Sequence, residues 1–288
     1  MFTMVLLGLG DVEQAGGALQ VAAGLAERHG AGLFVQHVSP PRSRDGACVL
    51  ELPTEKELEA RRAEVEALCR KHLPSGLTAD VAAGAGFLHV ELLKMARLAG
   101  PDLLVLGGGD ALEQCRRELD AGDSGREAAL VLAEAAPCPV LAVPETGGRT
   151  GPFERILTVV DAGRPDAARI DRPLLELAAR LAAREGAELH VLQPLPLPLG
   201  SAAPAQDEVA RKAQAARERL AYLCQGLPGS DRFRLDAAEG EPGVEIFKHA
   251  RERQADLLLL SSDHPVAAHV LRNARIPVLL ARPATRGV

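Results

Sequence analysis

Glycine residues flank a long acidic stretch in the first half of this chain, in an arrangement that could hold a phosphate group. Residues 103–106 are all apolar, as in a buried strand, and three consecutive glycines follow them. A second glycine cluster precedes the next apolar stretch. Glycine lets backbone N–H groups approach phosphate oxygens, and the start of a following helix adds a favourable dipole. The candidate phosphate ligands are Gly107, Gly108, Gly109, Ser124 and Gly125.

The same glycines have a second interpretation, as residues that allow turns in a surface loop. Between Gly107 and Glu127 there are six acidic residues against three arginines. This charge repels phosphate unless a divalent metal ion intervenes. The phosphate site and the plain loop therefore both remain open.

The corresponding segment of the second half contains serine, aspartate and histidine, the residue types of a hydrolytic triad. Ser261, Asp263 and His264 are nearly adjacent, however, whereas a triad draws its members from separate loops. We expect a short polar turn here. Cys138, between two prolines, is expected to be a small buried residue, and the histidines lack the spacing of metal ligands. No catalytic residue and no metal site are predicted.

The two halves of the chain repeat each other. Residues 102–106 return as 256–260 at an offset of 154, and an earlier echo in each half has an offset of 156. Two echoes in the same order indicate two fused copies of one domain. The predicted division is 1–146 for the first domain, 147–153 for the linker and 154–288 for the second domain.

Apolar runs and helical stripes alternate along each copy, which predicts a parallel sheet covered by helices on both faces. The expected strands lie at 5–9, 33–38, 77–81, 103–106, 140–143, 156–160, 189–192, 232–235, 257–260 and 278–280. The expected helices lie at 19–28, 54–72, 90–99, 128–135, 173–184, 208–223, 244–253 and 267–273. Thr54 with Glu57 has the capping-box pattern. Loops are expected at 40–47 and 194–205.

Composition excludes several classes of partner. Aromatic residues make up 2% of the chain, with no Trp, and residues 1–146 hold 13 basic against 21 acidic residues. Stacking platforms and a basic face are therefore missing, and we expect no nucleic-acid partner. The five cysteines form no Cys-x-x-Cys pair, and the N-terminus lacks a signal-peptide pattern. No apolar run is long enough to span a bilayer. These features predict a cytoplasmic protein without membrane association.

Several motifs resemble the universal stress protein family. They are the Gly-x-Pro step at 240–242, the Ala-Asp-Leu-Leu-Leu-Leu run at 255–260, and the segment Ala-Pro-Cys-Pro-Val-Leu-Ala-Val-Pro at 136–144. Their order in duplicate makes the chain similar to a tandem member of that family. The resemblance implies two α/β domains, each a five-stranded parallel-sheet sandwich of the nucleotide-binding α-hydrolase type. It further implies pseudo-twofold symmetry, with the last strands, 140–143 and 278–280, pairing near the axis.

ATP-binding members of the family use an aspartate after the first strand and a Gly-x2-Gly-x9-Gly-[Ser/Thr] segment after the fourth. In this chain the aspartate position falls on Gly10, and Asp11 reaches it only after a slip of one residue. The glycine segment of the first copy is too long and carries Asp110 in place of the second glycine. The second copy keeps Asp161 in the aspartate position but has no glycine after its fourth strand. Each copy therefore retains a different fragment of the site.

The sequence favours a non-catalytic stress-response regulator that binds protein partners. The alternative is a sensor that binds ATP or ADP through the first domain, with Asp11 near the nucleoside. An enzyme is the third alternative, either with weak ATP hydrolysis or as an adenylate-transferring or pyrophosphate-releasing member of the wider fold. The latter needs a Ser-Gly-Gly-x-Asp-Ser type of loop after the first strand, which the segment at 8–12 does not supply. Pairing of the two domains within the chain through their last strands is expected, and a further homodimer is the alternative assembly.

Overall fold

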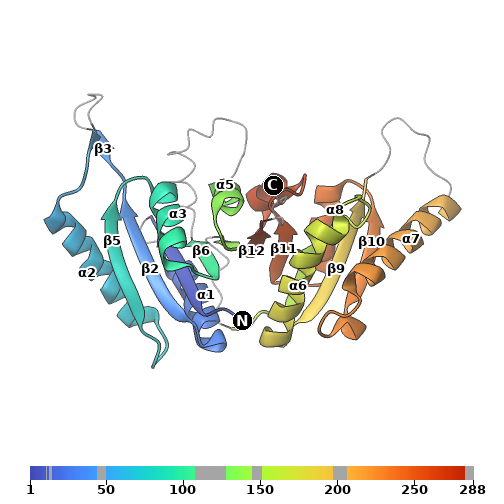
Figure 1. The fold of residues 1–288 in the computed structure, drawn as a ribbon, viewed down its shortest axis with the longest axis horizontal. Coiled ribbons are helices and arrows are strands. Elements are labelled where there is room, and N and C mark those ends of the chain that lie inside the picture. Colours follow the sequence, from blue (N-terminus) through green and yellow to red (C-terminus); the bar gives the residue numbers. More distant parts are fainter. Residues whose placement is uncertain are drawn as a thin grey trace. The chain divides into compact units, whose positions relative to one another are not determined.

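The computed structural model of the chain divides into two compact units, Phe2–Gly151 and Pro152–Val288. Figure 1 shows that each unit contains strands enclosed by helices. The structure describes residues 1–10, 12, 15–43, 50–107, 128–144, 151–196 and 206–282.

The first unit is built on a parallel sheet of five strands. The strand order is β5-β2-β1-β6-β7, and every pair in this row is parallel. The strands are β1 (Met4–Leu9), β2 (Gly32–Ser39), β5 (Ala79–Ala85), β6 (Leu103–Gly107) and β7 (Val140–Val143). The two central strands β1 and β6 are almost wholly buried, as their unbroken apolar sequences require.

Helices cover both faces of this sheet. They are α1 (Gly16–His29), α2 (Glu55–His72), α3 (Leu88–Ala99) and α5 (Ala128–Ala135). The chain moves outward from β1 to β2 to β5 and then returns to β6 and β7. Right-handed crossovers therefore place α1 and α2 together on one face and α3 and α5 together on the other.

The second unit repeats this plan. Its strand order is β10-β9-β8-β11-β12, again all parallel. The strands are β8 (Arg155–Val159), β9 (Glu188–Leu195), β10 (Arg234–Glu239), β11 (Leu257–Ser261) and β12 (Val278–Ala281). The helices are α6 (Ala167–Glu185), α7 (Gln206–Cys224), α8 (Pro242–Glu252) and α9 (Ala267–Asn273), with a short 3-10 turn, η2 (Ser230–Arg232). The duplication and the α/β fold class predicted from the sequence are confirmed.

One pair of aspartates marks equivalent points in the two units. Asp102 accepts hydrogen bonds from the backbone N–H groups of Thr3 and Met4, at the start of β1. Asp256 accepts the equivalent bonds from Glu154 and Arg155, at the start of β8. Each aspartate fixes where the first and fourth strands of its unit begin, so residues of the two units can be matched one to one.

Local signals explain several helix boundaries. Thr54 caps α2, and its hydroxyl accepts the Glu57 N–H while the Glu57 carboxylate accepts the Thr54 N–H, so the predicted capping box is confirmed. Gly30 ends α1 with a φ of 65°, a conformation that glycine adopts without steric cost. Each cap fixes one end of a helix that packs on the sheet.

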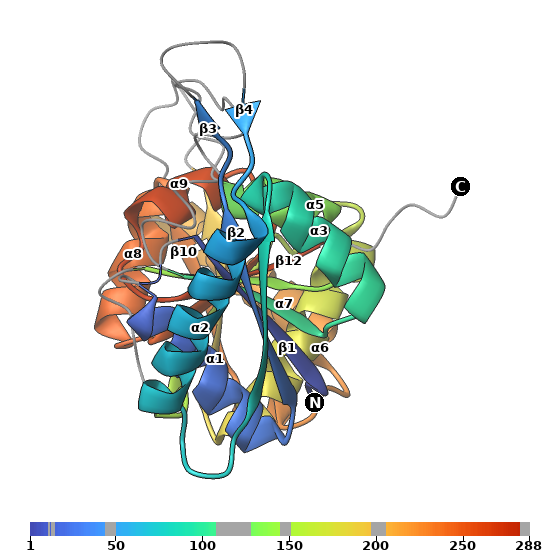
Figure 2. The same cartoon turned by 90° about the vertical axis from the view of Figure 1, so that its left-hand side faces the viewer.

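Some boundaries differ from the expected ones. Helix α6 begins at Ala167 and contains Pro173, which sequence reasoning took as its first turn. Part of the predicted loop at 40–47 is instead the strand β3 (Arg42–Ser43), paired antiparallel with β4 (Leu50–Glu51). Figure 2 shows these two short strands beyond the end of β2. Strand β9 runs to Leu195, because Pro194 can occupy a strand position where no N–H is required.

In the described part of the chain, no helix is long and apolar enough to cross a membrane.

Candidate functional site

The topology of each unit identifies where a ligand would bind. In an open parallel sheet, ligands occupy the crevice outside the carboxyl ends of the two strands at which the strand order reverses. In the first unit these strands are β1 and β6, and in the second they are β8 and β11. The loops that follow these strands therefore form the candidate site in each unit.

Most of the predicted ligands of the first unit lie outside the described residues. These are Asp11, Gly108, Gly109, Ser124 and Gly125. Gly107 is described, and it is the buried last residue of β6. A Cβ atom at this position would clash with the Cβ of Ala18 on α1. Gly107 is therefore needed for close packing between α1 and the sheet, whatever the following loop binds.

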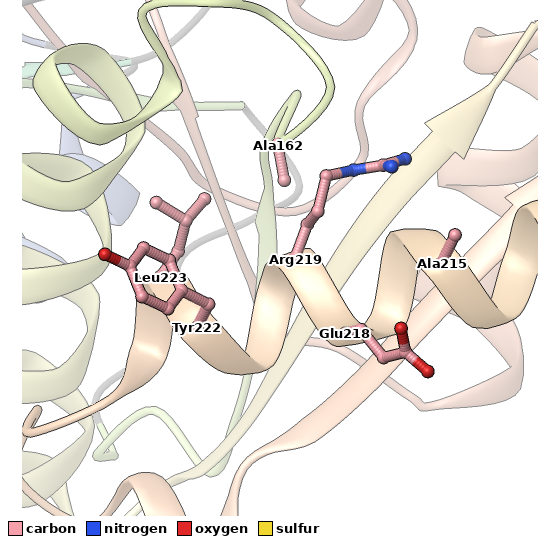
Figure 3. A pocket seen from close by; sticks show the side chains of 6 residues that line it. All are labelled: Ala162, Ala215, Glu218, Arg219, Tyr222 and Leu223. Carbon is pink, nitrogen blue, oxygen red and sulfur yellow. The ribbon is translucent and has the colours of Figure 1, made fainter.

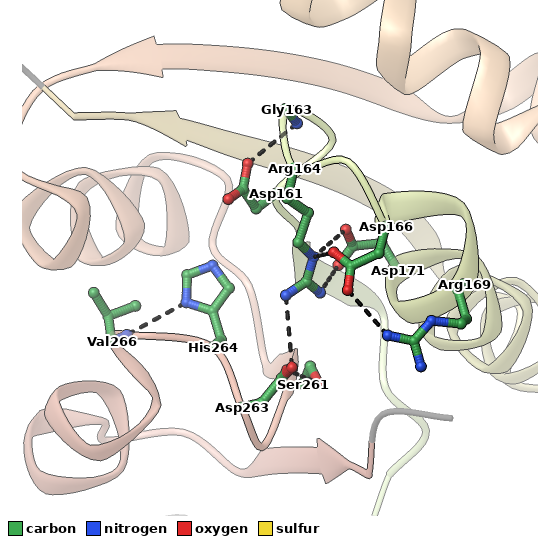
Figure 4. A network of polar contacts seen from close by, with 10 residues as sticks. All are labelled: Asp161, Gly163, Arg164, Asp166, Arg169, Asp171, Ser261, Asp263, His264 and Val266. Carbon is green, nitrogen blue, oxygen red and sulfur yellow. Dashed lines mark hydrogen bonds and ion pairs between the residues drawn. The ribbon is translucent and has the colours of Figure 1, made fainter. Parts of the chain in front are cut away.

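In the second unit, Asp161 lies directly after β8, as the sequence predicted. Its Oδ1 accepts a hydrogen bond from the backbone N–H of Gly163 at 3.1 Å. The carboxylate thus closes a tight turn in the loop between β8 and α6. Figure 4 shows Asp161 and Gly163 on one side of a larger polar network.

Arg164 is the centre of that network. Its Nη2 and Nε atoms donate to the two carboxylate oxygens of Asp171, on α6, at 2.8 and 3.2 Å. Its Nη1 lies 3.6 Å from Oδ2 of Asp263, in the loop that follows β11. One guanidinium therefore joins the loops after β8 and β11, across the crevice where a ligand would bind in this fold.

The ion pair between Arg164 and Asp171 is largely buried. The side chain of Asp171 is 1% exposed and that of Arg164 is 16% exposed. Burial raises the pKa of Asp171 above its usual range, and the two hydrogen bonds and the charge of Arg164 oppose that rise. A second ion pair, between Arg169 and Asp166 at 3.0 Å, lies at the surface beside it. A carboxylate as buried as Asp171 needs Arg164 as its partner.

The serine, aspartate and histidine after β11 form a polar turn, as expected. The Ser261 hydroxyl donates to Asp263 Oδ1, while His264 Nδ1 accepts from the backbone N–H of Val266 at 3.4 Å. The His264 N–H donates to the Ser261 carbonyl at 3.0 Å, but no hydrogen bond joins the two side chains among the described residues. Burial lowers the pKa of His264, although the charge of Asp161 acts in the opposite direction. The turn lacks the serine–histidine contact of a nucleophile and its base.

A shallow pocket of about 470 Å³ adjoins the loop that follows β8. It lies between Ala162, next to Asp161, and the helix α7. Its walls are partly apolar, from Leu223 and the exposed Tyr222, and partly charged. Figure 3 shows Arg219 rising from α7 on the side of Ala162, whereas Glu218 points away from it. Arg219 is the cationic side chain among the residues that line this pocket.

Sequence reasoning missed Arg164 and Asp171. Their separation of seven residues matches two helical turns, but Arg164 precedes the first turn of α6. The signal that could have identified them is Asp171 itself, a charged residue in a helix where apolar neighbours predict a buried face. The partner of Asp171 had to be a cation close to the start of the helix.

The residues that the structure describes contain neither a reactive thiol at Cys138 nor a cluster of metal ligands. Cys138 is buried, and burial raises its pKa to about 12, so the thiol stays protonated and unreactive at neutral pH. No group of three metal-ligating side chains occurs in the described ranges.

Comparisons with known proteins place this geometry in context. The model of the universal stress protein family matches residues 1–144 and 152–282. A universal stress protein from Archaeoglobus fulgidus DSM 4304 has a similar structure, with 15% identity, a TM-score of 0.64 and coverage of 98% of this chain and 97% of that chain. A protein of unknown function from Pseudomonas aeruginosa PAO1 is similar at 17% identity, with a TM-score of 0.63 and coverage of 98% and 93%.

A further structure contains a nucleotide. It is a universal stress protein from Archaeoglobus fulgidus in complex with dAMP, with 24% identity and a TM-score of 0.31, and it covers 44% of this chain and 97% of that chain. Its ligand is a property of that protein. No curated protein sequence matches this chain. The two likenesses over the full length show the fold.

Proposed function

We propose, from the premise that this chain belongs to the universal stress protein family as a tandem of two of its domains, that it is a non-catalytic stress-response module. In this proposal the chain acts by binding protein partners, and its nucleotide sites are degenerate. The observation that carries the proposal is the contact of Arg164 with Asp171 and Asp263, which occupies the second domain's crevice.

The loop after β11 supports the same conclusion. It passes from Ser261 to the start of α9 at Ala267 without a glycine. A phosphate cradle needs several backbone N–H groups that converge on one anion. Here the N–H groups of His264 and Ala267 already donate to carbonyls of the turn, and the N–H of Val266 donates to His264 Nδ1. Asp263 adds a negative charge at the position a phosphate would take.

An exposed apolar surface on α3 supports the partner-binding part of the proposal. Leu98 is 74% exposed, and Phe87 and Val90 are also exposed. Together with Lys94 and Arg97 this helix forms a shallow pocket of about 460 Å³. In the second domain the residues equivalent to Leu98 and Phe87 are Glu252 and Glu241, and only the equivalent of Val90, Val244, is apolar and exposed, so this surface is more apolar in the first domain. An amphipathic segment with acidic flanks would complement it.

Titration calorimetry of the intact chain with Mg-ATP tests the nucleotide part. We expect no saturable heat, while a cooperative thermal unfolding transition shows that the same sample is folded. Binding at micromolar concentration that is lost in Gly108→Val would overturn the proposal in favour of the first-domain ATP or ADP sensor. Turnover of ATP that is lost on replacing Asp11 would overturn it in favour of an enzyme.

Affinity capture from cell extract tests the partner-binding part. Wild-type chain and the variant Leu98→Glu, which introduces the charge found at position 252, are compared, with Tyr222→Glu as a control at another exposed site. We expect one or more proteins to be retained by the wild type and by Tyr222→Glu and lost from Leu98→Glu. Equal retention by all three would show that α3 is not the binding surface.

A further inference from the structure

The second domain has a polar pocket at the end of its sheet opposite to the crevice. The pocket has a volume of about 590 Å³ and is lined by the first residues of β8, β9 and β10 and by the end of α8. It holds three arginines and three carboxylates together with His190 and Gln254. Pockets of this volume accommodate small molecules.

Comparison with the first domain shows that the fold does not require these polar residues. The strand pairing and the matching aspartates align Arg155 with Met4, and they align His190 with Phe34. Asp236, Glu252 and Arg253 correspond in the same way to Ala82, Leu98 and Ala99. The first domain forms the same sheet edge with apolar or small side chains at all these positions.

Two of the residues also carry a physical cost. Gln254 has a φ of 51°, whereas its equivalent Gly100 has a φ of 60° and adopts this conformation without strain. His190 is 4% exposed, and its Nδ1 has no hydrogen-bond partner among the described residues. A buried unpaired nitrogen is unfavourable compared with the aromatic ring of Phe34. Both costly departures line the same pocket, which indicates that the pocket has a role beyond folding.

The ion pairs within the pocket determine which charges remain available. Arg234 pairs with Glu188 at 3.2 Å, and Arg253 pairs with Asp236 at 3.1 Å. Arg155 has no ion pair with any described residue, although it lines the pocket. Glu252 likewise lacks a cationic partner in the described ranges. The side-chain amide of Gln254 makes no hydrogen bond with any described residue. One positive charge, one negative charge and one neutral amide are thus left unpaired in one pocket.

We infer that this pocket binds a small zwitterion of the size of a free α-amino acid. The guanidinium of Arg155 would receive the carboxylate, since its planar donors match that group in geometry. Glu252 would receive the ammonium group, and the Gln254 amide would supply a further donor or acceptor. The Glu188–Arg234 and Asp236–Arg253 pairs would hold the walls in place. This site is separate from the crevice, so it does not depend on the proposed function.

The intact chain, labelled with ¹⁵N, is titrated with each of the twenty proteinogenic amino acids, and the amide signals of Arg253 and Gln254 are followed. Inorganic phosphate and ammonium chloride serve as probes that carry only one of the two charges. We expect saturable shifts with at least one amino acid and none with either single-charge probe. Absence of shifts with all twenty amino acids, or equal affinity for phosphate alone, would overturn the assignment.

Replacement by the first domain's own residues locates the site. Arg155→Met and Glu252→Leu remove groups without partners, so the fold is retained, and each should weaken binding by about tenfold or more. Gln254→Gly should weaken binding while raising the melting temperature. Arg217→Ala, at an exposed arginine on α7 that lines none of the pockets described above, is the control and should bind as the wild type does. Unchanged affinity in Arg155→Met and Glu252→Leu would place the ligand elsewhere and refute the proposal.

Discussion

Arg164 Nη2 lies 2.8 Å from Asp171 Oδ1, and the same guanidinium reaches Asp263 on the other side of the second domain's crevice. The guanidinium neutralises a buried carboxylate and joins the loops after β8 and β11. In the proposed function, both the stability of the second domain and the exclusion of ligand from its crevice depend on this side chain.

The variant Arg164→Met should lose much of the stability of the second domain. It leaves Asp171 buried without a partner, a change that costs about 3–5 kcal/mol in comparable buried pairs. Urea unfolding monitored by circular dichroism measures the loss. Arg169→Ala is the matched control, because its pair with Asp166 is 38% exposed on both sides and should contribute less than about 1 kcal/mol.

A double variant separates the charge from the packing. Arg164→Met combined with Asp171→Leu removes both charges, so it should recover most of the stability that Arg164→Met alone loses. A double variant as unstable as the single one would show that the guanidinium acts through its contacts with other groups.

Replacing Gly107 by alanine should destabilise the first domain even in the absence of any ligand. The new Cβ collides with Ala18 on α1, and overpacking of this kind costs about 1–3 kcal/mol. Gly16→Ala is the control, since a Cβ at that position meets no atom within 4 Å. Thermal unfolding of both variants provides the measurement, and equal melting temperatures would contradict the packing role of Gly107.

The imidazoles of His190 and His264 should contribute less to the free energy of unfolding as the pH falls from 7.5 to 5.5. Burial lowers the pKa of His190, opposed by the charge of Glu188, and burial also lowers the pKa of His264. The unfolded chain takes up protons on these imidazoles below about pH 6.5, whereas the folded chain does so only at lower pH. Their contribution is thus fully present above the unfolded pKa and is lost as the pH falls through the folded pKa.

The variant His190→Phe, with the residue of the first domain, isolates one of these contributions. Its unfolding free energy should change less between pH 7.5 and 5.5 than that of the wild type, as determined from urea midpoints at each pH. An unchanged pH dependence would mean that His190 is as accessible to protons in the folded chain as in the unfolded one.

Gln254→Gly should stabilise the second domain by about 1 kcal/mol, because glycine adopts a positive φ without the strain of a side chain. Differential scanning calorimetry measures the change. A lower melting temperature would show that the Gln254 side chain contributes contacts that outweigh the strain.

The fold could be predicted from the sequence because its signals are local and duplicated. The run at Leu103–Gly107 is too apolar for an exposed strand, and Thr54 with Glu57 marks a helix start by itself. The start of α6 was placed too late, since Pro173 has the pattern of a first helical turn and its position inside a longer helix depends on the tertiary packing of Ala167–Arg172.

The sites were harder to predict, since they depend on contacts between segments far apart in the sequence. Asp161 could be located after β8 from the repeat, but its neighbour Arg164 reaches Asp263 across about a hundred residues. The pocket of Arg155 and Glu252 combines residues of three strands and one helix. The repeat in the sequence pairs Leu98 with Glu252, but the pairing of Met4 with Arg155 follows only from the hydrogen bonds of Asp102 and Asp256 in the structure.

The backbone amide of Gly163 provides the most direct test of the proposal that nucleotide is excluded from the second domain's crevice, because it lies in the turn held by Asp161 beside Arg164. Its ¹⁵N–¹H signal is followed in the intact chain while Mg-ATP is added to millimolar concentration. The account predicts that this signal does not move, whatever the first domain binds. A saturable shift of the Gly163 signal would show that nucleotide enters the second domain's crevice and would contradict the account.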